Sequence, residues 1–163
     1  RIIGKRFKLV HVYKKNKVIE VSTFRSESAN TENNQQIVKD ASGKILRDNV
    51  WGSINDDCHR RDFTINAIYF NPISHELFDK HNGISDIYDK KIVSIGDPLL
   101  RFEEDPVRSL RAVRFASKLS FKIENKLKDA IYQKGHLLKH VSNARRFDEF
   151  NKIFLTFFME SLV

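Results

Sequence analysis

The residues best suited to chemistry form two short charged clusters. The first is Arg60, Arg61 and Asp62, in which a carboxylate stands beside two guanidinium groups. Opposite charges nearby favour an ionised carboxylate, which suits metal coordination or acceptance of a ribose hydroxyl proton. Guanidinium groups suit a triphosphate, because they pair with phosphate oxygens in a planar fork. The alternative is an ion cluster on the protein surface, which contributes little to stability.

The second cluster is Glu104, Asp105 and Arg108. On a single helix, Asp105 and Arg108 would lie about 60° apart on one face. An aspartate that accepts from an exocyclic amine, beside an arginine that donates to a ring nitrogen, matches the Watson–Crick edge of adenine or cytosine. Uracil and guanine present the opposite order. The alternative is an ordinary ion pair between residues i and i+3 of a helix.

The first cluster lies within a predicted helix over residues 54–67, where charged and apolar residues alternate at helical spacing. Ser53 is a suitable cap for its first turn. The sequence AIYFNP then indicates a strand that stops at Pro72, and residues 75–79 are predicted to be its hairpin partner. A further short strand is expected at 92–96.

The residues before and after this segment predict different elements. Residues 2–13 and 17–24 predict a β-hairpin, and the polar stretch 25–44 predicts a mobile loop. The second cluster opens a predicted helix over 104–118, which has an acidic first turn and basic residues later. Helices are also expected at 123–134 and 145–161. These elements indicate an α+β protein.

Composition narrows the class of partner. The 163 residues include 29 Lys and Arg against 21 Asp and Glu, a formal net charge of +8, which favours a polyanion such as RNA or a nucleotide. Apolar runs are too short to cross a bilayer, so no membrane partner is expected.

The single cysteine, Cys58, excludes a disulfide framework and favours the cytoplasm, and the six histidines lack zinc-ligand spacing with it. Because Met159 is the only methionine, we expect a piece of a longer protein.

Several stretches resemble the class II tRNA nucleotidyltransferase/poly(A) polymerase family. They are IEVSTFRSE at 19–27, RRDFTINAIYFNP at 60–72 and IGDPLLRFEEDPVRSLRAVRFASKLSFKI at 95–123. Within the family, IIGKRFKLVHV at 2–12 and LRDNVWGSINDDCHRRDF at 46–63 are more similar to bacterial poly(A) polymerases than to CCA-adding enzymes. The resemblance implies a partial polymerase-β-like nucleotidyltransferase palm over residues 1–98, followed by an all-α neck over 99–163.

The resemblance also implies an activity, the template-independent addition of AMP from ATP to RNA 3′ ends with two Mg²⁺ ions. It makes Asp62 catalytic, either as a metal ligand or as the partner of the ribose. It assigns nucleotide binding to Arg60, Arg61, Asn66, Asp105, Arg108 and Arg111. Of these, Asp105 and Arg108 would select the base and Arg111 would face the triphosphate. CCA addition and a non-catalytic nucleotide- or RNA-binding remnant stay open as alternatives, and the oligomeric state is not predicted.

The sequence departs from the family pattern in ways that lower the activity expected of this polypeptide alone. The family's Gly-Gly-x-Val-Arg-Asp turn and Asp-x-Asp strand would precede Arg1, so two of three metal-binding carboxylates are missing from the printed sequence. We therefore expect this chain by itself not to transfer nucleotides efficiently. Where the family often has prolines, residues 141–150 read VSNARRFDEF, which leaves the roles of Arg145 and Arg146 open.

Overall fold

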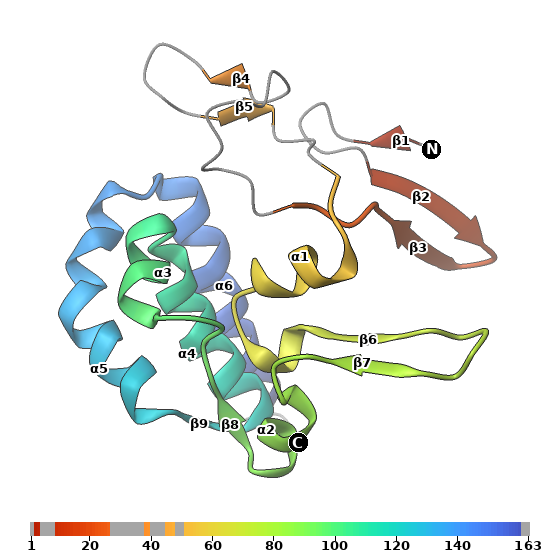
Figure 1. Cartoon of the computed structure of the whole chain (residues 1–163). Coiled ribbons are helices and arrows are strands. Elements are labelled where there is room, and N and C mark those ends of the chain that lie inside the picture. The colour runs from red at the N-terminus through yellow and green to blue at the C-terminus, as the bar shows by residue number, and fades with distance from the viewer. Residues whose placement is uncertain (1, 4–8, 27–37, 40–44, 48–50, 161–163) are drawn as a thin grey trace. The chain divides into compact units, whose positions relative to one another are not determined.

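The computed structural model describes residues 2–3, 9–26, 38–39, 45–47 and 51–160 (Figure 1). The chain divides into two compact units, residues 1–60 and 61–163. The second unit therefore spans residue 98, where the sequence placed the boundary between palm and neck. That boundary concerns functional parts and stays a prediction.

The first unit begins with a small antiparallel sheet in the order β1-β2-β3. Its strands are β1 (Ile2–Ile3), β2 (Leu9–Lys14) and β3 (Lys17–Val21). The pairing of β2 with β3 confirms the predicted hairpin. A second antiparallel pair joins β4 (Val38–Lys39) to β5 (Ile45–Arg47). Most of the predicted mobile loop at 25–44 lies outside the described residues.

Helix α1 (Ile54–His59) closes the first unit and begins where the sequence predicted. Ser53 caps it: the Asp56 backbone N–H donates to Ser53 Oγ, and the Asp56 carboxylate accepts from the Ser53 backbone N–H at 2.7 Å. The predicted helix over 54–67 is too long, because the chain leaves the helix after His59. A separate 3₁₀ turn, η1 (Thr64–Asn66), follows in the second unit.

The interruption before η1 has a tertiary cause within the second unit. The Asp62 carbonyl accepts from the Ile95 backbone N–H at 3.1 Å, and the Thr64 backbone N–H donates to the Val93 carbonyl at 3.1 Å. Phe63, between them, is extended. Pairing with residues 93–95 therefore replaces the local helical hydrogen bonds that the sequence pattern favoured.

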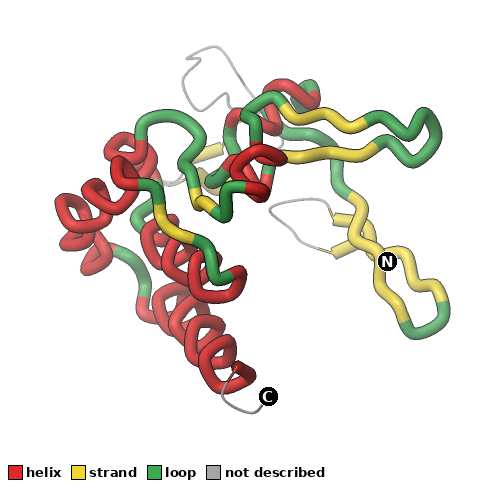
Figure 2. The backbone as a smooth tube through the Cα atoms, turned by 90° about the horizontal axis from the view of Figure 1, so that it is seen from below, coloured by secondary structure: helices red, strands yellow, loops and turns green. Residues whose placement is uncertain are grey.

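The strands of the second unit are short (Figure 2). Strands β6 (Ile68–Phe70) and β7 (Leu77–Asp79) form the predicted antiparallel hairpin. Strand β8 (Lys91–Ile92) pairs in parallel with β9 (Lys122–Ile123), so the strand expected at 92–96 is only partly formed. Helix α2 (Gly83–Tyr88) was not predicted; the Asp79 carboxylate accepts from the backbone N–H groups of Gly83 and Ile84 at its start.

The helical part consists of α3 (Pro98–Glu104), α4 (Val107–Leu119), α5 (Asn125–Lys134), the 3₁₀ turn η2 (Gly135–His140) and α6 (Asn143–Glu160). Helix α4 packs against α6, and α3 packs against α5 (Figure 1). The predicted helix over 104–118 begins late, because Asp105 is extended between α3 and α4. A residue before proline avoids the helical conformation, and Pro106 follows Asp105. Asp105 and Arg108 therefore do not share a helix, which corrects the single-face geometry.

The core of the second unit draws on its strands and its helices. Its buried members are Phe63, Ile92, Phe102, Ala112, Leu127 and Ala130. Phe63 is adjacent to Asp62 and its ring meets that of Phe115 edge-on, with ring centres 6.0 Å apart, so Asp62 is attached directly to this core. Across the part of the chain that the structure describes, no helix has both the length and the apolarity to span a membrane.

Candidate functional site

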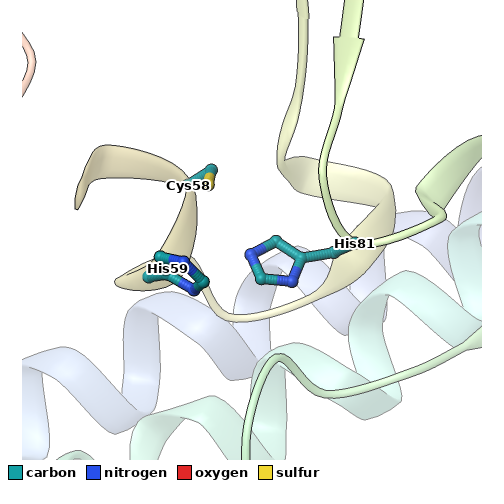
Figure 3. A group of neighbouring side chains, drawn as sticks. All are labelled: Cys58, His59 and His81. Carbon is teal, nitrogen blue, oxygen red and sulfur yellow. The ribbon is translucent and has the colours of Figure 1, made fainter. Parts of the chain in front are cut away.

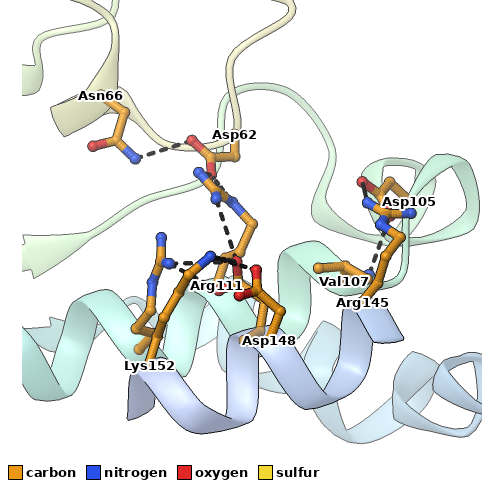
Figure 4. A network of polar contacts seen from close by, with 10 residues as sticks. Asp62, Asn66, Asp105, Val107, Arg111, Arg145, Asp148 and Lys152 are labelled. Atoms are coloured by element: carbon orange, nitrogen blue, oxygen red, sulfur yellow. Dashed lines mark hydrogen bonds and ion pairs between the residues drawn. The ribbon is translucent and has the colours of Figure 1, made fainter. Parts of the chain in front are cut away.

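Asp62 is the centre of a hydrogen-bonded group in the second unit (Figure 4). Its side chain is 9% exposed. Oδ1 accepts from the Phe63 backbone N–H at 2.9 Å and from Asn66 Nδ2 at 3.0 Å. Oδ2 accepts from Arg111 Nε at 2.7 Å and lies 2.7 Å from Arg111 Nη2. We call Asp62, Asn66 and Arg111 the Asp62 cluster; all three are residues that the sequence predicted.

Neighbouring elements hold the Asp62 cluster in place. Besides its pairing with residues 93–95, the segment is tied to α2, where Thr64 Oγ1 donates to Asp86 Oδ2 at 2.6 Å. Helix α2 approaches so closely that a Cβ atom on Gly83 would lie 2.3 Å from the Thr64 carbonyl oxygen. Arg111 comes from α4, 49 residues after Asp62. The cluster is therefore a tertiary arrangement, not a local turn.

Arg111 also faces a second acid, which the sequence analysis missed. Arg111 Nη1 lies 3.8 Å from Glu149 Oε1 on α6, and Arg114 Nη1 lies 3.0 Å from Glu149 Oε2. Lys152 Nζ donates to Glu149 Oε1 at 3.3 Å. The available signal was periodicity: Glu149 and the buried Ile153 are four residues apart, on one face of α6.

The second charged cluster is arranged differently from the prediction. Asp105 Oδ2 accepts from Arg145 Nη2 at 2.9 Å, and its Oδ1 accepts from the Val107 backbone N–H at 3.3 Å. Arg108 Nη1 instead donates to Glu104 Oε2 at 3.3 Å. Asp105 and Arg108 thus have different ion-pair partners, and Arg145, whose role was open, is the partner of Asp105 (Figure 4).

The surroundings of Arg108 disfavour its positive charge. Burial lowers the pKa of its guanidinium below the usual range, and the nearby positive charge of Arg101 lowers it further. Glu104, Asp105 and Asp62 oppose that decrease. A partly buried cation of this kind gains from an additional acceptor atom, because a buried charge is stable only when it is paired or hydrogen-bonded.

The two arginines before Asp62 have separate surroundings. Arg60, the last residue of the first unit, donates from Nε to Oδ1 of the buried Asp57 at 2.9 Å. Arg61 donates from Nε to the Tyr69 hydroxyl at 3.3 Å, and its guanidinium lies 5.8 Å from the centre of the Tyr69 ring. Within their own units, one arginine therefore pairs with an acid and the other lies on an aromatic ring.

Protein donors surround the carboxylate of Asp62. A carboxylate offers about four lone-pair positions, and Phe63, Asn66 and two nitrogens of Arg111 already occupy them. The metal role of Asp62 stays a prediction.

Cys58, His59 and His81 belong to two different units of the chain. Cys58 is buried in α1 and His59 is the last residue of that helix, in the first unit (Figure 3). His81 belongs to the second unit. No metal site is assigned to these three side chains.

Comparison with known families gives two matches along the chain. Residues 1–93 match the family described as "Poly A polymerase head domain". Residues 120–160 match the family described as "Probable RNA and SrmB- binding site of polymerase A". The first match covers the residues of the Asp62 cluster that precede α3, and the second covers Arg145 and Glu149.

Curated relatives agree with the family matches. The chain is 43% identical over 153 residues to poly(A) polymerase I of Haemophilus influenzae, which covers 94% of this chain and 34% of that protein. It is 38% identical over 144 residues to the CCA-adding enzyme of Anoxybacillus flavithermus, covering 88% of this chain and 34% of the relative. The chain thus spans about a third of the length of the curated relatives that it matches.

Solved structures share the fold. The CCA-adding enzyme of Bacillus stearothermophilus in complex with CTP has a TM-score of 0.72 and 33% identity, covering 93% of this chain and 33% of that one. A tRNA nucleotidyltransferase complexed with a primer tRNA and an incoming ATP analogue has a TM-score of 0.67 and 28% identity, covering 91% of this chain and 40% of that one. The predicted fold class, an α+β partial nucleotidyltransferase palm followed by an all-α neck, is confirmed.

Proposed function

Since the chain belongs to the poly(A) polymerase head-domain family, we propose that it binds ATP in an enzyme that adds AMP to RNA 3′ ends. In that reaction the RNA 3′-hydroxyl attacks the α-phosphorus of ATP, the hydroxyl proton is lost and pyrophosphate leaves. Catalysis of phosphoryl transfer consists mainly of positioning and charge stabilisation. The chain's own residues are proposed to supply the positioning of the nucleotide.

The Asp62 cluster is the observation that carries this proposal. Asp62 fixes the Asn66 amide and the Arg111 guanidinium, two groups suited to donate hydrogen bonds to hydroxyl and phosphate oxygens. The Arg111 side chain is 32% exposed, which leaves it accessible to a ligand. We assign ribose and phosphate contacts to Asn66 and Arg111, and to Asp62 the task of orienting them.

Selection of the base is assigned to Asp105 and Arg108, and Arg108 has the stronger support. A hydrogen bond to a ring nitrogen of adenine would stabilise the Arg108 guanidinium, because burial and the charge of Arg101 disfavour its positive charge. Asp105 is held by Arg145 and is proposed to accept from the exocyclic amine in that orientation. Arg60 and Arg61 remain predicted contacts of the triphosphate.

The proposal also concerns the metal ion, the acceptor and the location in the cell. The family resemblance implies Mg²⁺ and makes Asp62 a predicted ligand, but protein donors meet the Asp62 carboxylate in this arrangement, so no part of the proposal depends on the metal. An RNA 3′ end is the proposed acceptor, and the cytoplasm, where RNA and ATP meet, is the proposed location.

CCA addition to tRNA is the second candidate. The likeness to CCA-adding enzymes, in sequence and in structure, favours it. The two activities differ in their products, because one incorporates C, C and A in order and the other extends a tail of A. They also differ in acceptor, since CCA addition requires a tRNA that lacks its terminus.

A chimeric enzyme tests the proposed function. The whole chain would replace its matching segment in the Haemophilus influenzae poly(A) polymerase I, which supplies the remaining parts of the enzyme. Incubation with a labelled RNA primer and each nucleoside triphosphate in turn is expected to give a long tail with ATP alone. Ordered C, C, A addition to truncated tRNA would contradict this and support the second candidate. A folded chimera that binds ATP and RNA without transfer would support a non-catalytic remnant.

A further inference from the structure

Glu149 is a buried carboxylate on α6 that the proposed site does not yet use. It is 5% exposed, and its neighbours along the helix, Asp148 and Phe150, are exposed. Burying a carboxylate is unfavourable unless positive charges compensate. Three cations do so here: Arg114 at 3.0 Å, Lys152 at 3.3 Å and Arg111 at 3.8 Å.

The three guanidinium nitrogens of Arg111 face two different carboxylates. Nε and Nη2 point at Asp62 Oδ2, both at 2.7 Å, whereas Nη1 faces Glu149. The Arg111 guanidinium also lies 5.4 Å from the centre of the Phe115 ring. Acids on two sides and an aromatic face restrict a long side chain that would otherwise sample many rotamers. A ligand that binds Arg111 then loses less conformational entropy on binding.

We propose that Glu149 is a positioning residue that orients Arg111 for the phosphates of the nucleotide. The inference rests on the proposed function, because it concerns the same Arg111. It assigns a role to α6 beyond packing: α6 lies in the stretch matched by the second family, and through Glu149 it contacts a residue of the Asp62 cluster. Nucleotide binding by the head would thus depend on a residue of the neck.

If Glu149 acted on ATP only through its charge, removing that charge would change the affinity for ATP in the opposite direction. Glu149 is negative, so its field opposes the binding of a polyanion such as ATP. If charge alone mattered, removing it would strengthen ATP binding. If Glu149 positions Arg111, removing the charge would weaken ATP binding, because the guanidinium loses one of its two acidic partners. The direction of the change therefore separates the two roles.

The test compares Glu149→Gln with the matched control Asp148→Asn on the same helix. Asp148 is exposed and bonds to Lys152, so both substitutions remove one negative charge from α6. Calorimetric titration of the whole chain with ATP is expected to show about tenfold weaker binding for Glu149→Gln, as is typical of coupling between residues of one ion-pair network. Asp148→Asn is expected to stay within about twofold of the wild type, since exposed pairs contribute little.

Two further measurements exclude a merely structural effect. Glu149→Asp keeps the charge with a shorter side chain and is expected to bind ATP with intermediate affinity, which also serves if the Gln variant fails to fold. The ¹⁵N resonance of Arg111 Nε, assigned with Arg111→Lys, is expected to shift and broaden in Glu149→Gln and to stay unchanged in Asp148→Asn.

Each outcome decides the proposal. Unchanged or tighter ATP binding by folded Glu149→Gln, or an Arg111 resonance identical to that of the wild type, would overturn it. Absence of ATP binding by the wild-type chain would instead count against the proposed function. In that case the Arg111 resonance still decides whether Glu149 orients this side chain.

Discussion

The Asp62 cluster and the segment from Asp105 to Arg108 are both charged, but they are held in different ways. Asp62 is buried and each of its oxygens meets two donors; both donors at Oδ2 belong to Arg111, which lies 49 residues away in the sequence. Asp105 is held by Arg145, a side chain that is 56% exposed, and Arg108 by an exposed glutamate. The first site is fixed by the fold, and the second is held by pairs that water can weaken.

We expect the two regions to have different roles in nucleotide binding. Ribose and phosphates are the same in every nucleotide, so the residues that bind them can be rigid parts of the core. The base differs among nucleotides, and discrimination depends on a few polar atoms presented at the correct angle. Substitutions should therefore affect folding at the Asp62 cluster and nucleotide preference at the segment from Asp105 to Arg108.

The largest effect is expected for Asp62→Ala. Removing this carboxylate leaves the Arg111 guanidinium and the Asn66 amide without their shared acceptor. Breaking a buried ion pair from one side costs about 3–5 kcal/mol of unfolding free energy. Urea denaturation followed by the helical circular dichroism signal would measure it, because α3 to α6 lie in the same unit as the cluster. A loss below about 1 kcal/mol, the range of exposed pairs, would show that the cluster is not fixed.

Gly83→Ala should have the next largest effect, through the support of the cluster. The added Cβ would lie 2.3 Å from the Thr64 carbonyl oxygen, so α2 or η1 must move. Overpacking of this kind costs about 1–3 kcal/mol. Gly135→Ala is the matched control, since no atom lies within 4 Å of its added Cβ and its backbone is helical. The control should be neutral or stabilising by about 0.4–1 kcal/mol in the same denaturation experiment.

Arg108→Ala should alter preference more than stability. In the chimeric enzyme, its loss removes the proposed donor to adenine N1, and incorporation of ATP relative to UTP, whose ring N3–H cannot accept from an arginine, should fall about tenfold, as for one hydrogen bond to a charged group. Competition between the two nucleotides at equal concentration would measure the ratio. An unchanged ratio, with tail synthesis intact, would remove Arg108 from base selection.

Arg145→Ala should have the smallest effect on folding. Its pair with Asp105 is exposed, so the loss should stay below about 1 kcal/mol. Thermal melting of the variant beside Asp62→Ala gives the contrast directly. A loss as large as that of Asp62→Ala would mean that the two regions are held equally firmly.

The sequence predicted the elements whose patterns are local. The hairpin of β2 and β3, the hairpin of β6 and β7, and the cap at Ser53 all follow from short-range chemistry. The sequence also predicted Asp62, Asn66 and Arg111 as site residues, and the structure brings these three side chains into contact, while their roles in nucleotide binding stay predictions.

The remaining features depend on contacts between distant residues. The helix over 54–67 was predicted as continuous because nothing local shows that Asp62 and Thr64 bond to residues 93–95. The single helix face predicted for Asp105 and Arg108 was wrong because the extended residue before Pro106 separates two helices. Glu149 was missed because two of the cations that compensate its burial, Arg111 and Arg114, come from α4, far from Glu149 in the sequence.

The most direct test of the central claim is calorimetric titration of the chain with ATP, comparing the wild type with Arg111→Lys. Lysine keeps the charge but cannot donate from three nitrogens to Asp62, Glu149 and a phosphate. If the Asp62 cluster binds the nucleotide, the wild type should bind one ATP per chain and the variant should bind at least about tenfold more weakly with its helical signal unchanged. Equal affinities in two equally folded proteins would contradict the account.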